Sequence, residues 1–311
     1  MPRATRPTMK DVARASGVSP ATVSFVLNDS AGQTIPEETR ARVHRAATEL
    51  GYVPHGVARA LREGTSRVVV LQVARLPHGS GVMSGYIDGL DDELGRLGHT
   101  LLVRYGDRAD GTARLVDAIS PRAILDLDRI YEADAPELAD GGWVDGLAAH
   151  TAVQFRHLAE RGHTGIALAL RAGERFERLG DIRLAYARAV APTLGLRGIP
   201  TLTVGRSLDD DLAAVRDLRA THPEVTAIAG LDDDAALRVM SAAHRLGLAV
   251  PDDLAVIGFD DTAAGELFSP SLTTLRVDAA AFGRRAARVL LGRPVGELAP
   301  GAATVVQRES A

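Results

Sequence analysis

Side chains that could carry a reaction are few in this sequence. Cysteine is absent, which excludes thiolate nucleophiles, disulfides and cysteine-ligated metals. His150, His157 and His163 are separated by seven and six residues, so they do not share one helix face, and no carboxylate joins them at ligand spacing. No pair of nucleophile and base stands out along the chain. We therefore predict no catalytic residue, no metal site and no cofactor.

A glycine-rich stretch at 79–85, GSGVMSG, follows an expected strand and precedes an expected helix. Such a stretch could bind the pyrophosphate of a dinucleotide, as in an NAD-type Rossmann enzyme. That motif needs its first glycine directly after the strand, whereas residues 74–78 intervene here. We interpret the glycines as a flexible loop, and we keep the NAD-type enzyme as a less favoured alternative.

Charge is unevenly distributed along the 311 residues, a length typical of about two domains. Residues 1–66 hold nine basic and six acidic side chains, a charge of +3, so the rest of the chain carries −7 of the total of −4. A small basic head on an acidic body indicates nucleic-acid contact at one end. No apolar run reaches the roughly 18 residues of a membrane helix, and the first residues lack a secretory apolar run. A cytoplasmic protein without membrane contact is expected.

The helices that would position such a contact have clear start and stop signals. Thr8 and Asp11 form a capping box that starts a first helix, and Gly17 ends it. Ser19 is a good N-cap and Pro20 a good first residue for a second helix. Two short helices joined by a turn with glycine predict a helix-turn-helix, whose second helix enters the major groove of DNA.

A third helix is expected from Glu37 to Leu50, opened by a capping box from Thr34 to Glu37. Its apolar side chains can close a small core against the first helix. The residues expected to face this core are Val12, Ala13, Ala15, Val43, Ala46, Ala47 and Leu50.

The stretches TMKDVARASGVSPATVSFVLN and IPEETRARVHRAATELGYVPHGVARAL resemble the DNA-binding head of the LacI/GalR family of bacterial repressors. The resemblance covers about sixty positions, so it includes the helix-turn-helix, the third helix and the hinge that follows. It implies a transcriptional regulator, most simply a repressor, that binds double-stranded DNA at a pseudo-palindromic operator. The DNA-binding residues that it implies are Thr8, Ser19, Pro20, Ala21, Thr22, Ser24, Phe25, Asn28, His55, Ala58 and Leu61.

Phe25 departs from the family pattern, which usually has arginine at this position. Arginine can bond bidentately to guanine, whereas phenylalanine makes only apolar contacts, for instance with a thymine methyl group. Phe25 could equally pack on the protein's own surface. Asn28 matches the family's asparagine at the helix end, where capping is a more natural role than DNA reading.

Residues 54–61, PHGVARAL, resemble the family's hinge helix, which lies in the minor groove as a symmetric pair. Leu61 takes the position of the wedge that opens the central base step, and Ala58 that of the small residue before it. His55 replaces the usual asparagine, and Gly56 lowers helix propensity by roughly 1 kcal/mol relative to alanine. The hinge is therefore expected to order only on DNA.

From Arg67 onwards short apolar runs alternate with helical stretches, which predicts parallel sheets with helices on both faces. The pattern splits into two halves near residues 143–163. The fold expected is α/β, with an N-terminal all-α helix-turn-helix head and a core of two Rossmann-like subdomains, similar to the periplasmic-binding-protein-like core of the same family. The domains expected are 1–53 for the head, 54–66 for the hinge helix and linker, and 67–311 for the effector-binding and dimerisation core.

Ligands bind beyond the carboxyl ends of the strands in such sheets. AIAGLDDDAAL and AVPDDLAVIGFDD resemble family motifs, which implies that Asp232 and Asp260 bind a small effector, expected to be sugar-like because carboxylates accept hydroxyl hydrogen bonds. Asp232, Asp233 and Asp234 could instead form a solvated helix start, where acids interact favourably with the helix dipole. Ile182 stands where the family has an arginine that holds the effector. Either the backbone is shifted by one residue and Arg183 takes this role, or the pocket has no such arginine.

The first subdomain is abbreviated, because residues 126–143 are too short for a further strand and helix. The sequence shows no heptad repeat after Arg308 of the kind that forms tetramers in some members of the family. A homodimer formed through the core is therefore expected. A stand-alone sugar-binding protein is the other alternative, but the basic head argues against it.

Overall fold

The computed structural model describes residues 7–27, 35–52, 64–73, 81–106, 108–127, 142–298 and 301–311. The chain divides into two compact units, residues 1–66 and 67–311. Residues 53–63, which include the predicted hinge helix, lie outside the described residues. The predicted bounds of the three domains therefore stay predictions. No helix in the described part of the chain is long and apolar enough to cross a membrane.

The first unit contains the three predicted helices, α1 (Met9–Ser16), α2 (Pro20–Leu27) and α3 (Glu37–Glu49). The Thr8 backbone N–H donates to the Asp11 carboxylate at 2.9 Å, and this capping-box bond confirms the predicted start of α1. Gly17 ends α1 with a φ of 67°, a left-handed conformation that glycine adopts without strain. The Ser19 hydroxyl accepts the Thr22 N–H at 3.0 Å and caps α2 as expected.

The capping box predicted at the start of α3 is wrong. Pro36 is the N-cap with ψ 141°, and Glu37 is the first helical residue rather than the third. The reason is that a proline disfavours helical geometry at the residue before it, which keeps Ile35 out of the helix. Thr34 itself lies outside the described residues.

A small hydrophobic cluster holds these three helices together. It consists of Val12, Ala13, Val23, Val26, Val43, Ala46, Ala47 and Tyr52. Two side chains predicted for this core are outside it: Ala15 is exposed, and Leu50 is 39% exposed. Ala15 lies about 100° around the helix from the centre of the buried face, and Leu50 caps α3 beyond its last turn.

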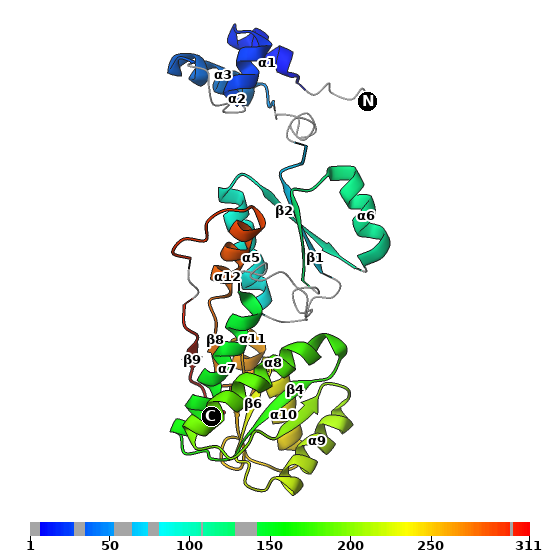
Figure 1. The fold of residues 1–311 in the computed structure, drawn as a ribbon, viewed down its shortest axis with the longest axis vertical. Coiled ribbons are helices and arrows are strands. Elements are labelled where there is room, and N and C mark those ends of the chain that lie inside the picture. Colours follow the sequence, from blue (N-terminus) through cyan, green and yellow to red (C-terminus); the bar gives the residue numbers. More distant parts are fainter. Residues whose placement is uncertain are drawn as a thin grey trace. The chain divides into compact units, whose positions relative to one another are not determined.

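The second unit begins with a three-stranded parallel sheet of order β2-β1-β3. Helix α5 packs against this sheet, and α6 follows β2 (Figure 1). The bounds are β1 Val68–Val73, α5 Gly81–Arg96, β2 Thr100–Tyr105, α6 Arg108–Ile119 and β3 Ala123–Asp126. The flexible loop predicted at 79–85 is wrong from Gly81 onwards, because α5 begins there and buries Val82 and Met83 in the core.

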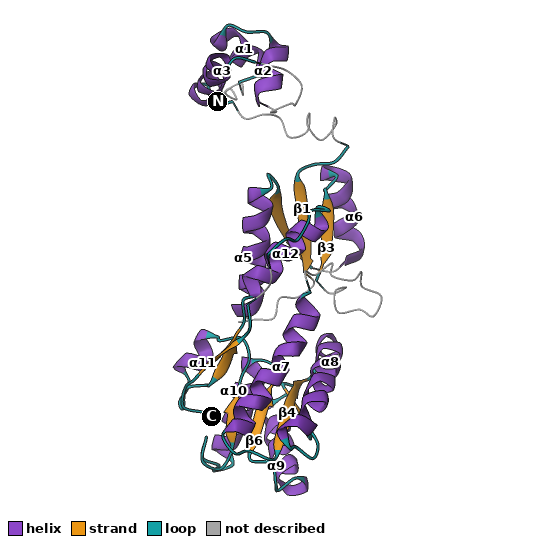
Figure 2. Cartoon of the chain, turned by 60° about the vertical axis from the view of Figure 1, so that its left-hand side comes forward, coloured by secondary structure: helices purple, strands orange, loops and turns teal. Residues whose placement is uncertain are grey.

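A four-stranded parallel sheet of order β5-β4-β6-β7 forms the second half. Helices lie on both of its faces (Figure 2), which confirms the predicted α/β class. The strands are β4 Ile166–Arg171, β5 Thr201–Val204, β6 Ala227–Gly230 and β7 Ala255–Ile257. The helices are α7 Trp143–Glu160, α8 Glu174–Val190, the 3-10 turn Ala191–Leu194, α9 Leu208–Thr221, α10 Asp233–Arg245 and α11 Ala263–Leu267.

The chain then returns to the first half. An antiparallel pair, β8 (Thr274–Arg276) and β9 (Thr304–Val306), flanks helix α12 (Ala279–Leu290), and α12 lies along α5 (Figure 1). The two helices touch closely, since a Cβ on Gly89 would lie 2.1 Å from the Ala280 carbonyl oxygen.

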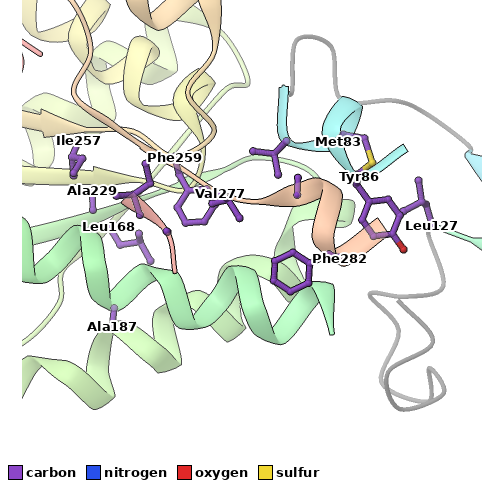
Figure 3. Close-up of a cluster of buried hydrophobic side chains, with 14 of the residues drawn as sticks. Met83, Tyr86, Leu127, Leu168, Ala187, Ala229, Ile257, Phe259, Val277 and Phe282 are labelled. Carbon is purple, nitrogen blue, oxygen red and sulfur yellow. The ribbon is translucent and has the colours of Figure 1, made fainter. Parts of the chain in front are cut away.

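One hydrophobic cluster connects the two sheets (Figure 3). It runs from Leu168 and Ile257 in the second sheet through Phe259, Val277 and Phe282 to Tyr86 and Leu71 in the first half. The Phe282 ring of α12 also packs against Gly146 of α7, where a Cβ would lie 2.3 Å from the ring. The core of the second unit is therefore continuous across both halves.

Candidate functional site

In the first unit, α2 presents its first turn to solvent. Ser19, Pro20 and Ala21 are exposed, whereas Val23 and Val26 point into the three-helix cluster. Thr22, Ser24 and Phe25 are half-buried. Thr8 is exposed at the N-terminus of α1. Four residues predicted to bind DNA lie outside the described residues, namely Asn28, His55, Ala58 and Leu61.

In the second unit, polar side chains gather where β4, β6 and β7 end. The central one is Arg183 of α8, which is 1% exposed. Its Nε donates to Thr151 Oγ1 at 2.8 Å, and its two Nη atoms donate to the Leu231 carbonyl oxygen and to Gln154 Oε1. Every nitrogen of this guanidinium group thus has a protein acceptor. The guanidinium carbon also lies 4.1 Å from the centre of the Phe259 ring.

Gln154 completes a buried polar node with Arg183. Its Nε2 donates to the carbonyl oxygens of Gly230 at 3.0 Å and Gly258 at 2.8 Å, the residues that end β6 and follow β7. Thr151 and Gln154 lie one turn apart on α7, so that helix is fastened to both strands and to α8. Sequence reasoning missed both residues, and the available signal was two polar residues three positions apart in one helix.

Asp260 lies beside this node. It follows β7 with a φ of 135°, and its carboxylate accepts no hydrogen bond from the described residues. Burial raises the pKa of the Asp260 carboxyl well above its usual range, and the neighbouring charges of Asp232 and Asp233 raise it further. Arg183 and Arg171 act in the opposite direction. A carboxyl group without hydrogen-bond donors beside a buried cation is well suited to a polar ligand.

Asp232 is the N-cap of α10, where its Oδ1 accepts the Ala235 N–H at 2.7 Å. Its Oδ2 lies 2.9 Å from Arg171 Nη1, and Arg171 also pairs with Asp234 at 2.9 Å. The predicted effector residue Asp232 therefore already has two protein partners, and this charge network lies next to Asp260.

The solvated helix start considered for Asp233 is wrong. Its side chain is 1% exposed and accepts hydrogen bonds from the Thr262 N–H at 2.7 Å, the Thr262 hydroxyl and the Thr274 hydroxyl. Burial raises the pKa of Asp233, because it outweighs these hydrogen bonds. Asp234 is 44% exposed and pairs with Arg171 and Arg238, so only this residue is a solvated acid at the helix start.

Ile182 and Arg183 have different surroundings, and whether Arg183 replaces the family's arginine in binding an effector stays a prediction. Ile182 packs against the hydrophobic core, whereas Arg183 occupies the polar cluster. His150, one residue before Thr151, has a buried Nδ1 with no hydrogen-bond partner among the described residues. Burial and the Arg183 charge lower the pKa of His150, so its ring is neutral near pH 7.

Two family models match this chain. The model of bacterial regulatory proteins of the lacI family matches residues 8–55, and that of a periplasmic binding protein-like domain matches residues 155–310. The chain is 30% identical over 314 residues to the HTH-type transcriptional repressor PurR of Vibrio campbellii, covering 92% of this chain and 91% of that protein. It is 29% identical to the ribose operon repressor of Bacillus subtilis, with 94% of each chain covered.

Solved structures agree on the fold. The lac repressor bound to ONPG in its repressed state has a TM-score of 0.69 at 23% identity, with 99% of this chain and 100% of that chain covered. The complex of the transcriptional regulator CelR with cellobiose has a TM-score of 0.60 at 24% identity, with 98% and 100% covered. The chain therefore belongs to the lacI family of bacterial regulatory proteins, as a DNA-binding transcriptional regulator with a ligand-binding core.

Proposed function

We propose that the chain is a cytoplasmic, dimeric repressor that binds a pseudo-palindromic operator and changes its operator affinity when a small ligand binds the core. The observation that carries the proposal is the helix-turn-helix whose second helix keeps its first turn exposed, in the basic part of the chain. We assign the protein a binding role rather than a catalytic one.

The DNA contacts proposed fall into three groups. The first turn of α2 faces base edges through Pro20 and Ala21, with Ser19, Thr22, Ser24 and Phe25 beside them. Thr8 at the exposed start of α1 is placed for a phosphate oxygen, since helix N-termini attract anions. The hinge contacts proposed are His55, Ala58 and Leu61, with Leu61 as the minor-groove wedge and Asn28 as a cap or backbone contact.

The ligand site proposed lies at the carboxyl ends of β4, β6 and β7. Asp260 is its main contact, because its carboxylate has no hydrogen-bond donor from the described part of the chain. Arg183 and Asp232 are proposed as further contacts, although their hydrogen bonds to Thr151 and to the Ala235 N–H also stabilise the fold. A ligand rich in hydroxyl groups fits these acceptors. A sugar is the first class to test, given the cellobiose complex of the similar regulator CelR.

A dimer fits the proposed operator, because two symmetric heads read two half-sites. The similar lac repressor has been crystallised as a dimer bound to operator, at 24% identity to this chain. Light scattering of the full chain at micromolar concentration should therefore give the mass of a dimer. A monomer or a tetramer would contradict this proposal.

The test of function is selection of a binding site from random duplex DNA with the full-length chain. A two-fold symmetric consensus is expected, and binding without sequence preference would overturn the proposal. Ligands are then screened for their effect on operator affinity, with cellobiose and D-ribose included. Leu61→Ala should weaken operator binding and leave the fold intact, whereas unchanged affinity would show that the hinge assignment is wrong.

Asp260→Ala tests the ligand site, with Asp252→Ala as its control because Asp252 is exposed. Asp260→Ala should weaken binding of an active ligand tenfold or more, and it should leave DNA binding without ligand unchanged. Ligand affinity within about twofold of wild type would show that the site is misassigned.

A further inference from the structure

The DNA-facing helix α2 has an unusual set of side chains. Its sequence is PATVSFVL, which contains no arginine, lysine, asparagine, glutamine, aspartate or glutamate. Val23 and Val26 are buried in the three-helix cluster, and Leu27 packs against it. The five side chains left are a proline, a methyl group, two hydroxyl-bearing residues and an aromatic ring.

The hydroxyl groups of this surface already have partners. Ser19 Oγ accepts the Thr22 N–H at 3.0 Å, and the two hydroxyl oxygens lie 2.9 Å apart. Ser24 also has an interaction partner in the protein. Because the Thr22 hydroxyl is engaged in the helix cap, its methyl group is the part best placed for a further contact.

Phe25 extends the apolar part of this surface. It lies four residues after Ala21 and three after Thr22, so the three side chains are neighbours on one helix face. The half-buried side chains that pack against the three-helix cluster are Met9, Val18, Leu27 and Ile35, and Phe25 is not one of them. Among the described residues of the head, its ring therefore takes no part in the hydrophobic cluster.

The major-groove edges of the four base pairs are recognised by different side chains. Guanine is read by bidentate arginine or lysine and adenine by bidentate asparagine or glutamine, whereas the 5-methyl group of thymine is read by apolar contact. Helix α2 has none of the first four side chains, and it carries methyl groups and a phenyl ring among the side chains that the cluster does not bury.

We propose that α2 reads its operator half-site through thymine methyl groups, with Phe25 as the main contact and with Ala21 and the Thr22 methyl group beside it. This inference rests on the proposed DNA-binding function and specifies what the DNA must offer. The half-site opposite α2 contains A·T pairs, and their 5-methyl groups carry the recognition rather than their hydrogen-bonding edges.

The test uses the operator obtained by binding-site selection and the unmodified full-length protein. Each thymine of the half-site is replaced by uracil, which removes one methyl group and keeps every hydrogen-bonding group. At least one position should lose about fourfold in affinity, the value of one buried methyl group, and about fifteenfold when both symmetric positions are changed. An operator in which that T·A pair is replaced by a 5-methylcytosine·G pair should bind the protein more tightly than one with an unmethylated C·G pair.

Two variants identify the residue that makes the contact. Phe25→Ala should weaken binding to the thymine operator. The affinity of this variant should no longer change when uracil replaces thymine at one position, because the methyl group has lost its partner. Phe25→Leu should keep part of the thymine preference. Leu50→Ala, which changes an exposed residue at the end of α3, should keep the full ratio between thymine and uracil operators.

The outcomes separate this inference from the function on which it rests. Failure to select any sequence would overturn both. A selected operator that tolerates uracil at every position within about 1.5-fold would overturn the thymine reading and leave the repressor proposal standing. A half-site with G·C pairs at every position opposite α2 would do the same.

Discussion

The two sheets of the core are built alike but are held to their surroundings by different physical means. In the first half, α5 and α12 approach so closely that glycine is required at their crossing, and a Cβ on Gly283 would lie 2.0 Å from the Tyr86 carbonyl oxygen. In the second half, the buried node of Arg183 and Gln154 connects two helices to two strand ends. Backbone contact fastens one half, and a hydrogen-bond network fastens the other.

The strands of the two sheets also differ in how deeply their residues are buried. All residues of β6 and β7 are buried and β5 alternates between exposed and buried residues, whereas in the first half only β1 is mostly buried, β2 has only exposed and half-buried residues, and Ile124 of β3 is 41% exposed. A polar network can replace the hydrogen bonds of water only where water is excluded and every partner is present. The half with the more deeply buried strands is therefore the half that can hold a charged cluster and a ligand site.

The largest effect is expected at the helix crossing of the first half. Gly89→Ala should lower the free energy of unfolding by about 2–4 kcal/mol, because the new Cβ meets the backbone of Ala280, which cannot rotate away. Urea denaturation of the full chain measures this. Gly95→Ala on the same helix meets nothing within 4 Å and should instead stabilise by roughly 0.5–1 kcal/mol. A cost below about 1 kcal/mol at Gly89 would show that the helices can separate freely.

The polar node of the second half should be the next most sensitive place. Gln154→Leu leaves the carbonyl oxygens of Gly230 and Gly258 and one Arg183 nitrogen without their partner, at a cost of about 2–3 kcal/mol. Gln307→Leu replaces an exposed glutamine and should change the free energy of unfolding by less than about 0.5 kcal/mol. Equal effects of the two variants would mean that the node does not fasten α7.

Asp260→Asn should have a smaller effect of opposite sign. The pKa of Asp260 is raised in the folded protein, so the fold loses stability as the pH rises from the pKa of an unfolded aspartate to this raised pKa, above which the loss is complete. The asparagine variant should therefore be more stable than wild type at high pH, and this advantage should shrink to zero as the pH falls toward about 4, the pKa of an unfolded aspartate. Thermal melting at several pH values measures the difference. A variant that is less stable at neutral pH would contradict the prediction.

The smallest effect is expected at the outer face of the first sheet. Val70 and Ile124 are register partners on β1 and β3, but Val70 is fully buried and Ile124 is 41% exposed. Ile124→Thr should change the free energy of unfolding by less than about 0.5 kcal/mol, whereas Val70→Thr buries a hydroxyl group and should cost about 1–3 kcal/mol. A large loss at Ile124 would mean that this face is covered in the assembled protein.

Local signals predicted the head and the strand-helix alternation because they depend on neighbours in sequence. The capping box at Thr8, the N-cap at Ser19 and the helix end at Gly17 each involve residues at most four positions apart. The errors have equally local causes, since Pro36 moved the start of α3 and Leu50 fell beyond its last turn. Single elements were predicted less completely than the alternation, since helices α6, α8 and α9, the short helix α11 and the β8-β9 pair were not predicted.

By itself the sequence determined the class of protein, the place of the DNA-reading helix and the presence of Asp232 and Asp260 at strand ends. Only the tertiary structure decided that α12 returns to pack on α5, and that Arg183 is committed to Thr151, Gln154 and Leu231. The physical reason is that helix and strand signals come from residues close in sequence. The environment of a buried charge is instead set by groups brought together from α7, β6 and α8, which no local pattern specifies.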